Sequence, residues 1–461
     1  MKATFVGGGA HRVLGILRAV LSQPGVLDGG EVYLHDLNVT RAEAVGRILK
    51  KTPEYQRNPM TVRWGDDLDE ALEGADVVSV ILMAGSNHSY FFSNSICLRH
   101  GFLGTDNISP SGSFLAIKGA SILLDVARRM ERLCPDAWLI DFANPVAVLS
   151  GMINRHTRIR CLGVCAGFTN HQWDLARIFG KDEWSTEFHV TAAGVNHLSF
   201  IMDGTRQGRD LFTELNALLL QGDWHPTAIA GYSEKSSSDM LVGIKKLVDL
   251  YREHRFMIFS TEPDGSCHFY YDEEVRSCPR YEDAELTAMI QAGNERRNAA
   301  NAAFEAHARQ ELDAAFWAQP RLLNDPFATL QDDIFVRVIR GASGVEPVEI
   351  VTSRLNAGAI AGIEDEHVVE YSQRLYGREI RPAGRFRLPA VAQGLICGIA
   401  HHQTLLGDAC FAGDPQLLAV ALKAYPVKAF TPESRALYRE LFALNQKEIP
   451  QSLYEAVKEF Q

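Results

Sequence analysis

The sequence predicts an α/β protein that begins with a doubly wound parallel sheet of the Rossmann type. Three observations carry this prediction. Strand-like apolar runs alternate with helical patterns over the first 165 residues, several of these runs are apolar throughout, and three glycines follow the first run directly. Such alternation is typical of parallel sheets, in which helices cover both faces and the strands are buried on both sides.

The individual elements can be placed in order along the chain. Strands are expected at residues 3–6, 31–35, 61–64, 76–82, 137–142 and 160–164, with helices between most of them at 13–21, 41–51, 68–72, 117–133 and 146–155. The second part does not repeat this pattern, with strand-like runs at 187–193 and 198–203 and helical patterns at 239–253, 284–309 and 433–444. We therefore expect a Rossmann domain over 1–165 and an α+β domain over 166–461, packed closely with the active site between them.

Composition and charge exclude several classes of protein. The net charge is −11 over 461 residues, and the acidic excess is spread along the chain, which argues against binding to nucleic acid or to an anionic membrane. No apolar run approaches the roughly 18 residues of a membrane helix. Eight cysteines are too sparse for a disulfide framework, and a strand is expected from residue 3, which leaves no room for a signal peptide. We expect a cytoplasmic enzyme with a small-molecule substrate.

The turn after the first strand has the composition of a dinucleotide site. Gly7, Gly8 and Gly9 let the backbone approach a pyrophosphate, and the following helix would direct its N–H groups at the same place. Asp36 ends the second strand, where a carboxylate binds the ribose diol of NAD and disfavours the 2′-phosphate of NADP. Arg12 departs from the usual fingerprint, because a final Gly or Ala is common there. The sequence predicts NAD binding by these glycines and Asp36; a tight turn without a ligand is the alternative.

A cysteine and a histidine are expected at the same edge of the sheet. Cys165 follows the sixth strand, and His197 follows the strand-like run that ends at residue 196. A thiolate and an imidazole can bind a divalent ion and leave positions open, which suits a catalytic ion that chelates substrate hydroxyls. Cys161 lies inside the strand, so we expect it in the core. From the spacing alone, however, a buried apolar cysteine and a structural histidine are the commoner explanation.

Several motifs, in this order, resemble those of glycoside hydrolase family 4, the NAD- and metal-dependent glycosidases. The similarity includes the glycine turn with its later acid, Asp36, and an Asn-Pro after the fifth strand at Asn144. It continues with Gly-Val-Cys at 163–165, Gly-Val-Asn-His at 194–197 and Asn-Ala-Gly-Ala-Ile at 356–360. Glycine turns are common, but the later motifs in this order are specific. They favour the hypothesis that Cys165 and His197 bind a metal ion.

The resemblance implies an unusual hydrolysis, an exception to the two-carboxylate scheme. NAD takes a hydride from C3 of the sugar, and a divalent metal such as Mn²⁺, held by Cys165 and His197, stabilises the enediolate formed when C2 loses its proton. The C1 substituent leaves by elimination, water adds at C1, and the hydride returns. Asn144 would bind the sugar hydroxyls near the nicotinamide. The alternative for Asn144 is a strand-end residue that caps the next helix.

The resemblance places the base in the segment 263–271 but leaves its identity open. Asp264, Tyr270 and Tyr271 are each candidates for removing the C2 proton. His268 resembles a substrate-contacting histidine of the uronidase and α-glucosidase branches of the family. The alternative for the whole segment is a surface loop with a buried aromatic anchor.

Two departures from the family bear on the substrate. Ala166 follows the metal-binding cysteine where Asp, Asn or His is usual, and the loop 84–90 lacks the arginine of phosphosugar-specific members. We expect a glycosidase for a uronic acid or an unphosphorylated hexoside and, from the family, a homodimer or homotetramer. One alternative is a 2-hydroxyacid dehydrogenase of the lactate or malate type, which shares the fold but does not need Cys165. The other is a sensor that binds NAD and sugar without catalysis.

Overall fold

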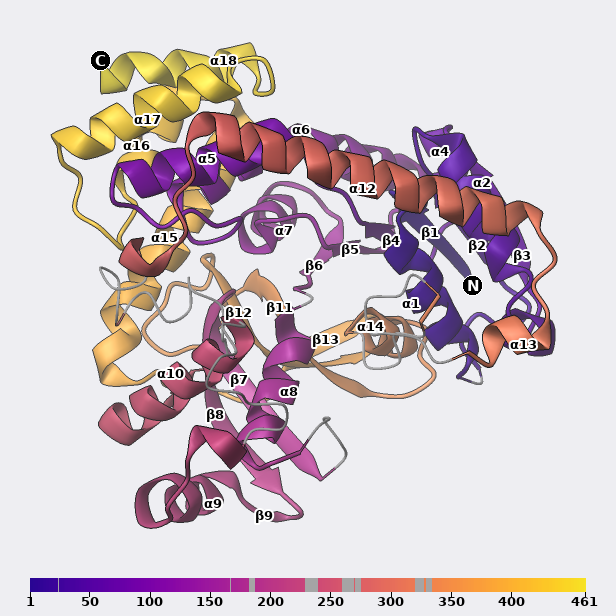
Figure 1. Ribbon diagram of the computed structural model, residues 1–461, viewed down its shortest axis with the longest axis horizontal. Helices are drawn as coiled ribbons and strands as arrows, with labels where there is room; N and C mark the ends of the chain where they lie inside the picture. The colour runs from indigo at the N-terminus through magenta and orange to yellow at the C-terminus, as the bar shows by residue number, and fades with distance from the viewer. Residues whose placement is uncertain are drawn as a thin grey trace.

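The computed structural model describes most of the chain. The described residues are 1–23, 25–165, 167–181, 187–228, 239–258, 269, 275–319, 327–328 and 334–461. Strands and helices alternate along the first part of the chain, and the later part adds antiparallel strands and long helices (Figure 1).

Six parallel strands form the N-terminal half of the sheet, in the order β3-β2-β1-β4-β5-β6. Their bounds are β1 Lys2–Val6, β2 Glu31–His35, β3 Thr61–Gly65, β4 Val77–Val80, β5 Trp138–Asp141 and β6 Arg160–Gly163. This is the strand order of doubly wound dinucleotide-binding sheets, in which ligands bind where the order reverses, between β1 and β4. The predicted fold class is confirmed.

Seven helices connect these strands: α1 His11–Leu21, α2 Val39–Leu49, α3 Pro53–Arg57, α4 Leu68–Leu72, α5 Asn87–Arg99, α6 Pro110–Leu133 and α7 Val146–His156. Helices α3 and α5 were not predicted from the sequence. The pattern of α5 is obscured because polar side chains, including Ser89 and Ser93, are buried on it. These serines face α6 and α17 rather than solvent.

The sheet continues without a break into the C-terminal half. Strand β11 (Val348–Leu355) pairs with β6 in the antiparallel direction at Ser353 and Gly163. Beyond it lie β12 Val368–Tyr376, β7 Phe188–Val195, β8 Leu198–Arg206 and β10 Met257–Ile258, while β13 Glu379–Pro382 and β9 Arg209–Asp210 pair with β12 and β8. One hydrogen-bonded sheet therefore crosses the boundary expected at residue 165, and the division into two domains stays a prediction.

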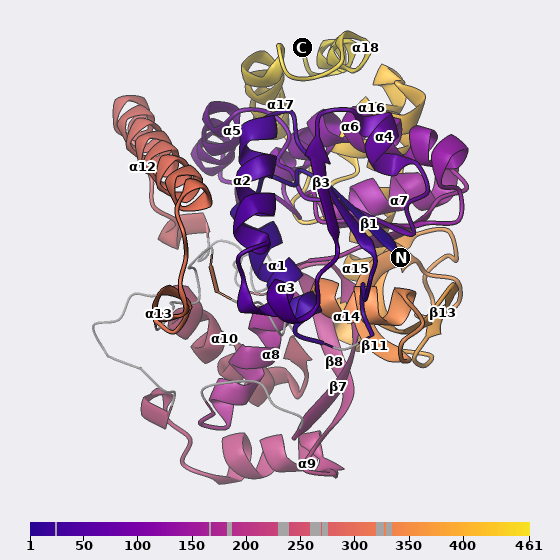
Figure 2. The same ribbon diagram turned by 90° about the vertical axis from the view of Figure 1, so that its right-hand side faces the viewer.

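The later helices cover this extended sheet and the Rossmann helices. They are α8 Gly167–Ile178, α9 Leu211–Asn216, α10 Asp239–His254, α12 Asp283–Arg309, α13 Ala314–Trp317, α14 Ile334–Ala342, α15 Ala390–Ala412, α16 Pro415–Lys423, α17 Pro432–Asn445 and α18 Gln451–Tyr454. The long α12 lies along α2 and α5 on the outside of the molecule (Figures 1 and 2). None of the helices in the described part of the chain has the length and apolar character needed to span a bilayer.

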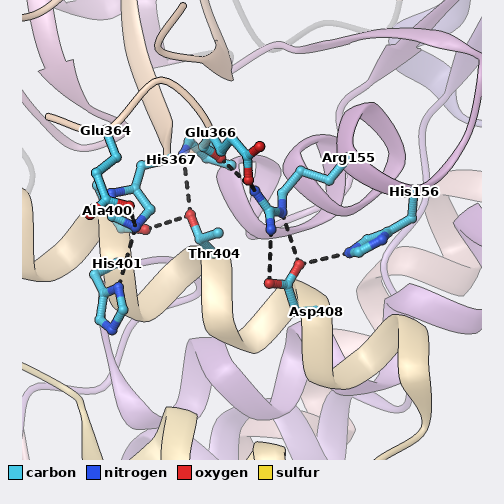
Figure 3. A network of polar contacts seen from close by, with 10 residues as sticks. Arg155, His156, Glu364, Glu366, His367, Ala400, His401, Thr404 and Asp408 are labelled. Atoms are coloured by element: carbon cyan, nitrogen blue, oxygen red, sulfur yellow. Dashed lines mark hydrogen bonds and ion pairs between the residues drawn. The ribbon is translucent and has the colours of Figure 1, made fainter.

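A polar network joins α7 of the first half to α15 of the second (Figure 3). Arg155 donates from Nε and Nη2 to the two carboxylate oxygens of Asp408, at 2.9 and 3.1 Å. His156 Nε2 lies 2.7 Å from the same carboxylate, and Arg155 Nη1 also donates to the carbonyl oxygen of Glu366. Both halves of the chain are thus connected by side chains as well as by the sheet.

Candidate active site

The glycine turn after β1 is shaped by close contact with both neighbouring strands. The N–H groups of Gly7 and Gly8 both donate to the carbonyl oxygen of His35, at 2.9 and 2.8 Å. Gly7 has a φ of +89°, and a Cβ built on it would lie 2.0 Å from the carbonyl oxygen of Ile81. A side chain at Gly7 would therefore be strained and would also clash with backbone. The turn requires glycine here whether or not a ligand binds.

Asp36 closes this turn from the end of β2. Its carboxylate accepts N–H groups from Gly9 at 2.9 Å and from Asn38 at 2.8 Å. The next side chain, Leu37, is 89% exposed, so an apolar surface stands beside the carboxylate. Helix α1 begins two residues after the glycines, and no side chain caps its N-terminus. Uncapped N–H groups, an acid and an apolar surface are the features that a pyrophosphate, a ribose and an adenine need.

A cavity of about 500 Å³ opens at the carboxyl ends of the central strands. Its wall includes Arg12 from α1 and Phe142 and Asn144 from the segment after β5, together with Cys165 and His197. The Arg12 guanidinium lies 5.2 Å from the centre of the Phe142 ring. The residues predicted for the sugar and the metal thus line one cavity, and Ala10, which directly follows the glycine turn, lines it too.

The structure brings Cys165 and His197 together. Cys165 Sγ lies 3.5 Å from His197 Nε2, although 32 residues separate them in the sequence. His197 occupies the tight turn between β7 and β8 with a φ of +67°, and the Gly167 N–H donates to the sulfur at 3.3 Å. Cys161, in contrast, is fully buried within β6, where burial raises the pKa of its thiol. It lies in the core, as its place in the strand pattern predicts.

Asn144 and a loop before α6 form the polar side of the cavity. Asn144 Nδ2 donates to Asp106 Oδ2 at 2.7 Å, and the Asn144–Pro145 bond is cis. The other carboxylate oxygen of Asp106 accepts from Asn107 Nδ2 at 3.1 Å, and Asn107 Nδ2 is also 2.9 Å from His197 Nε2. The candidate sugar-binding amide and the candidate metal-binding imidazole are therefore connected through two adjacent loop residues.

Asp106 and Asn107 were not predicted from the sequence. They lie in a polar segment just before Ser109, which caps α6, and Pro110, which begins it. A Ser-Pro pair is a good signal for a helix start, and it could have marked the preceding loop as one that ends at the ligand edge of the sheet. Nothing in the local pattern shows, however, that this loop reaches the turn containing His197.

A buried carboxylate supports the turn that carries His197. Glu370 on β12 is 8% exposed and accepts from Asn196 Nδ2 at 2.8 Å. Burial raises the pKa of Glu370, while the Asn196 amide and the nearby His197 oppose that shift. The polar contact fixes the residue just before His197. The sequence signal for this role is weak, because Glu370 lies in a strand that also contains Ser372, Gln373 and Arg374.

The remaining predicted residues lie outside the described part of the chain. These are the base candidates Asp264, Tyr270 and Tyr271, the substrate candidate His268, and Ala166. Their roles stay predictions.

Comparison with solved structures supports the same overall fold. A 6-phospho-α-glucosidase from gut microorganisms, solved with NAD and glucose-6-phosphate, aligns over 98% of this chain and 99% of its own, with a TM-score of 0.79 and 17% identity. The 6-phospho-β-glucosidase of Thermotoga maritima, also solved with NAD and glucose-6-phosphate, aligns over 97% and 99%, with a TM-score of 0.75 and 16% identity. At these identities the likeness concerns the fold.

Sequence relatives include enzymes for different sugars. The α-galactosidase of Bacillus subtilis (strain 168) is 29% identical over 221 residues, which are 46% of this chain and 50% of that relative, so the chain matches about half of its length. The 6-phospho-β-glucosidase of Escherichia coli (strain K12) is 24% identical over 98% of this chain and 96% of its own. The α-galacturonidase of Thermoanaerobacter italicus is 26% identical over 46% of this chain and 47% of its own.

Family models match almost the whole sequence. The model described as family 4 glycosyl hydrolase matches residues 2–181, and the model of the C-terminal domain of that family matches residues 192–427. The resemblance found in the sequence motifs is thereby confirmed, and with it the prediction of an enzyme. The chain belongs to family 4 of the glycosyl hydrolases.

Proposed function

We propose that this chain is an NAD- and divalent-metal-dependent glycosidase for a uronic acid or an unphosphorylated hexoside. One observation carries the proposal: the Asn144 amide and the Cys165–His197 pair line one cavity at the carboxyl edge of the sheet, and Ala10, which directly follows the glycine turn, lines it too. Because hydrolysis does not itself require a dinucleotide, the nucleotide-type turn supports a redox step.

The residues present fit NAD. Asp36 offers a carboxylate to a ribose diol, and the uncapped N-terminus of α1 offers N–H groups to a pyrophosphate. The exposed Leu37 offers an apolar surface to an adenine. Relatives of the same fold have been solved with NAD, which agrees with this assignment.

The residues present also fit a divalent metal. Cys165 Sγ and His197 Nε2 converge at the cavity wall, and a thiolate with an imidazole is a common ligand pair for such ions. A 6-phospho-α-glucosidase of the same fold has been solved with Mn²⁺. We therefore propose Cys165 and His197 as metal ligands, with Mn²⁺ as the first ion to test.

The chain's own residues would position the sugar and move its protons. When bound, NAD supplies a reversible hydride acceptor, and the divalent ion supplies a Lewis acid. Asn144 presents its amide to sugar hydroxyls and is held in place by Asp106. The base that removes the C2 proton is proposed to be Asp264, Tyr270 or Tyr271, and His268 is proposed to contact the sugar.

The charge of the segment 84–90 favours a sugar without phosphate. Residues 84–90, which form the end of the loop after β4 and the first turn of α5, include no lysine or arginine. Lys118 lies behind this loop with its side chain only 3% exposed, and its ammonium group is neutralised by Glu448 at 3.3 Å. Glu448 in turn accepts the hydroxyl of Ser86 at 2.6 Å. Little uncompensated positive charge is therefore available at this loop for a phosphate group.

A 6-phosphoglycoside is the second candidate substrate. The Escherichia coli 6-phospho-β-glucosidase matches nearly the full length of this chain, whereas the α-galactosidase matches about half of it. Arg12 at the cavity wall is a cation that a phosphate or a carboxylate could approach. The two candidates differ in the charge on C6, so they can be separated by experiment.

The test is a panel of nitrophenyl hexosides, uronides and 6-phosphohexosides in both anomeric forms, with NAD and Mn²⁺ omitted in turn. We expect turnover of a uronide or a neutral hexoside, lost when either NAD or Mn²⁺ is left out, and solvent deuterium at C2 of the product. Turnover restricted to the 6-phosphates would overturn the substrate proposal. NAD and metal binding without turnover or C2 exchange would identify a sensor, and activity without NAD would contradict the mechanism.

A further inference from the structure

The loop after β4 is held at both of its ends. At the first end, Ile81 donates its backbone N–H to the carbonyl oxygen of Val6 at 2.9 Å. The Ile81 carbonyl oxygen also lies against the glycine turn, since a Cβ built on Gly7 would be 2.0 Å from it. At the second end, Ser86 contacts Glu448, which is 362 residues later and follows α17. The position of this loop therefore depends on a residue from a distant part of the chain.

The Glu448 carboxylate accepts hydrogen bonds from the start of α5. Its Oε1 atom accepts from the backbone N–H of Ser86 at 3.2 Å and from the Ser86 hydroxyl at 2.6 Å. Its Oε2 atom accepts from the hydroxyl of Ser89. Ser86 is the N-cap of α5, and its hydroxyl oxygen also accepts from the Ser89 N–H. One carboxylate thus fixes the place where the loop becomes a helix.

A buried lysine neutralises this carboxylate. Lys118 Nζ lies 3.3 Å from Glu448 Oε2 and also donates to Ser89 Oγ at 2.9 Å and to Asn445 Oδ1 at 3.1 Å. The Lys118 side chain is 3% exposed and the Glu448 side chain is 25% exposed. Burial by itself raises the pKa of Glu448, but two serine hydroxyls and the Lys118 ammonium group together lower it below its usual value. Glu448 is therefore a charged acceptor at neutral pH.

The loop between these two ends forms part of the cavity wall. Residues 81–83 line the cavity that also contains the proposed metal ligands. Only two residues separate them from Ser86, and the second of these, Gly85, lies so close to Glu448 that a Cβ would be 2.5 Å from Oε2. A dinucleotide binds to doubly wound sheets where the strand order reverses, which is between β1 and β4 here. Displacement of the loop would move the wall of that site.

We propose that Glu448 is a positioning residue for NAD binding. It holds the loop after β4 beside the glycine turn, with residues 81–83 at the reversal of strand order. The carboxylate acts through Ser86 and does not itself need to reach the cofactor. Helix α17, which precedes Glu448, packs on α5, so the contact is part of a larger interface (Figure 1). This inference rests on the NAD site of the proposed function.

The test measures NADH affinity by nicotinamide fluorescence without sugar or metal, and the melting temperature of each variant. E448A removes the acceptor of the loop and breaks the ion pair. We expect it to weaken NADH binding about tenfold, because charge-assisted hydrogen bonds that hold the loop are lost. E448Q keeps one oxygen that can accept from Ser86, so it should bind NADH more tightly than E448A does.

K118M separates loop position from stability. It breaks the same ion pair but leaves the hydrogen bonds from Ser86 and Ser89 to Glu448 in place. We expect it to lower the melting temperature as E448A does, because a partly buried charge loses its partner in both variants. Its affinity for NADH should stay close to that of the wild type.

Glu459 provides a matched control. Its carboxylate accepts from Lys423 Nζ at 3.1 Å, and none of its hydrogen bonds in the described part of the chain reaches the loop after β4. We expect E459A to leave NADH affinity unchanged. If E448A does not fold, G85A decides, because its Cβ would push the loop away from Glu448 without removing a charge. G85A should also weaken NADH binding.

Two failures can be told apart. Wild-type protein that binds no NADH would overturn the NAD site of the proposed function. Wild-type binding with unchanged NADH affinity in E448A, or in G85A where E448A does not fold, would overturn this inference alone. An equal loss of NADH affinity in E448A and K118M would show that the ion pair supports the fold in general, and would also count against a positioning role.

Discussion

The Asp36 carboxylate holds the backbone of the glycine turn in place. It accepts two backbone N–H groups, from Gly9 and Asn38, and its side chain remains partly exposed. We expect Asp36→Ala to weaken NADH binding by about 1–3 kcal/mol, because charge-assisted hydrogen bonds to the ribose are lost. Titration by nicotinamide fluorescence measures this. Asp67→Ala is the control, since Asp67 also accepts two N–H groups after a strand but at the start of α4; an equal loss there would refute a specific role.

The buried carboxyl group of Asp141, at the end of β5, is expected to make the stability of the protein depend on pH. It is fully buried, its Oδ1 accepts from Ala143 N, and Oδ2 has no partner among the described residues. Burial raises its pKa well above the usual value, against the opposing Ala143 hydrogen bond. The folded state then holds a proton that the unfolded chain has already released, so stability falls as pH rises from about 4 toward the folded pKa.

Asp141→Asn should remove this dependence. The stability of the variant relative to the wild type should increase with pH over that window, by about 1.4 kcal/mol for each unit by which the folded pKa is raised. Urea unfolding at pH 4.5 and 7.5 provides the measurement. Asp125→Asn, at an exposed site on α6, should show no such change. The prediction would be refuted if the free energies of unfolding of Asp141→Asn and wild type differed by the same amount at both pH values.

At the residue scale, the sequence predicted the parts of the site that depend on local pattern. Cys165 and His197 each follow a strand, and strands of one sheet bring their ends together, so their proximity could be expected while their metal role stays a prediction. Asn107 could not be found in this way. It is 90 residues from His197, and their contact depends on the path of an irregular loop, which no periodicity encodes.

At the scale of elements, the parallel strands were predicted well because they are apolar on both faces. The long α15 and the strands β11 and β12 were not identified as elements. Helix α15 packs against α6, α7 and α16, so apolar residues occur around much of it and its periodicity is weak. Strand β12 includes buried polar residues, among them Glu370 and Gln373. These residues interrupt the apolar pattern by which a buried strand is recognised in a sequence.

Hydrogen bonds between α7 and α15 are expected to contribute to the stability of the fold (Figure 3). Asp408 receives two hydrogen bonds from Arg155 and lies beside His156, in a partly buried position. Asp408→Asn should lower the free energy of unfolding by about 1–3 kcal/mol, because the charged acceptor is lost while Arg155 stays partly buried. Glu366→Gln, at a carboxylate that is 80% exposed, should change it by less than about 1 kcal/mol. Equal effects in urea unfolding would argue against this assignment.

At the scale of the whole molecule, the two halves are joined where β6 meets β11 and where α15 packs on α6 and α7. The sequence indicated a Rossmann part and a different C-terminal part, but the pairing of β6 with a strand almost 190 residues later could not be read from it. Pairing of distant strands is set by the packing of the complete chain.

We expect the chain to unfold in one cooperative calorimetric transition, which NAD shifts as a whole. Ligand at about 100 times its dissociation constant adds about 2.7 kcal/mol to the stability of the unit that binds it. If the sheet makes both halves one unit, NAD should slow global hydrogen exchange in β7 and β8 as much as in β1, and mass spectrometry of peptic fragments measures this. Separate domains divided near residue 165 would instead give two transitions, with NAD raising only the first and leaving exchange in β7 and β8 unchanged.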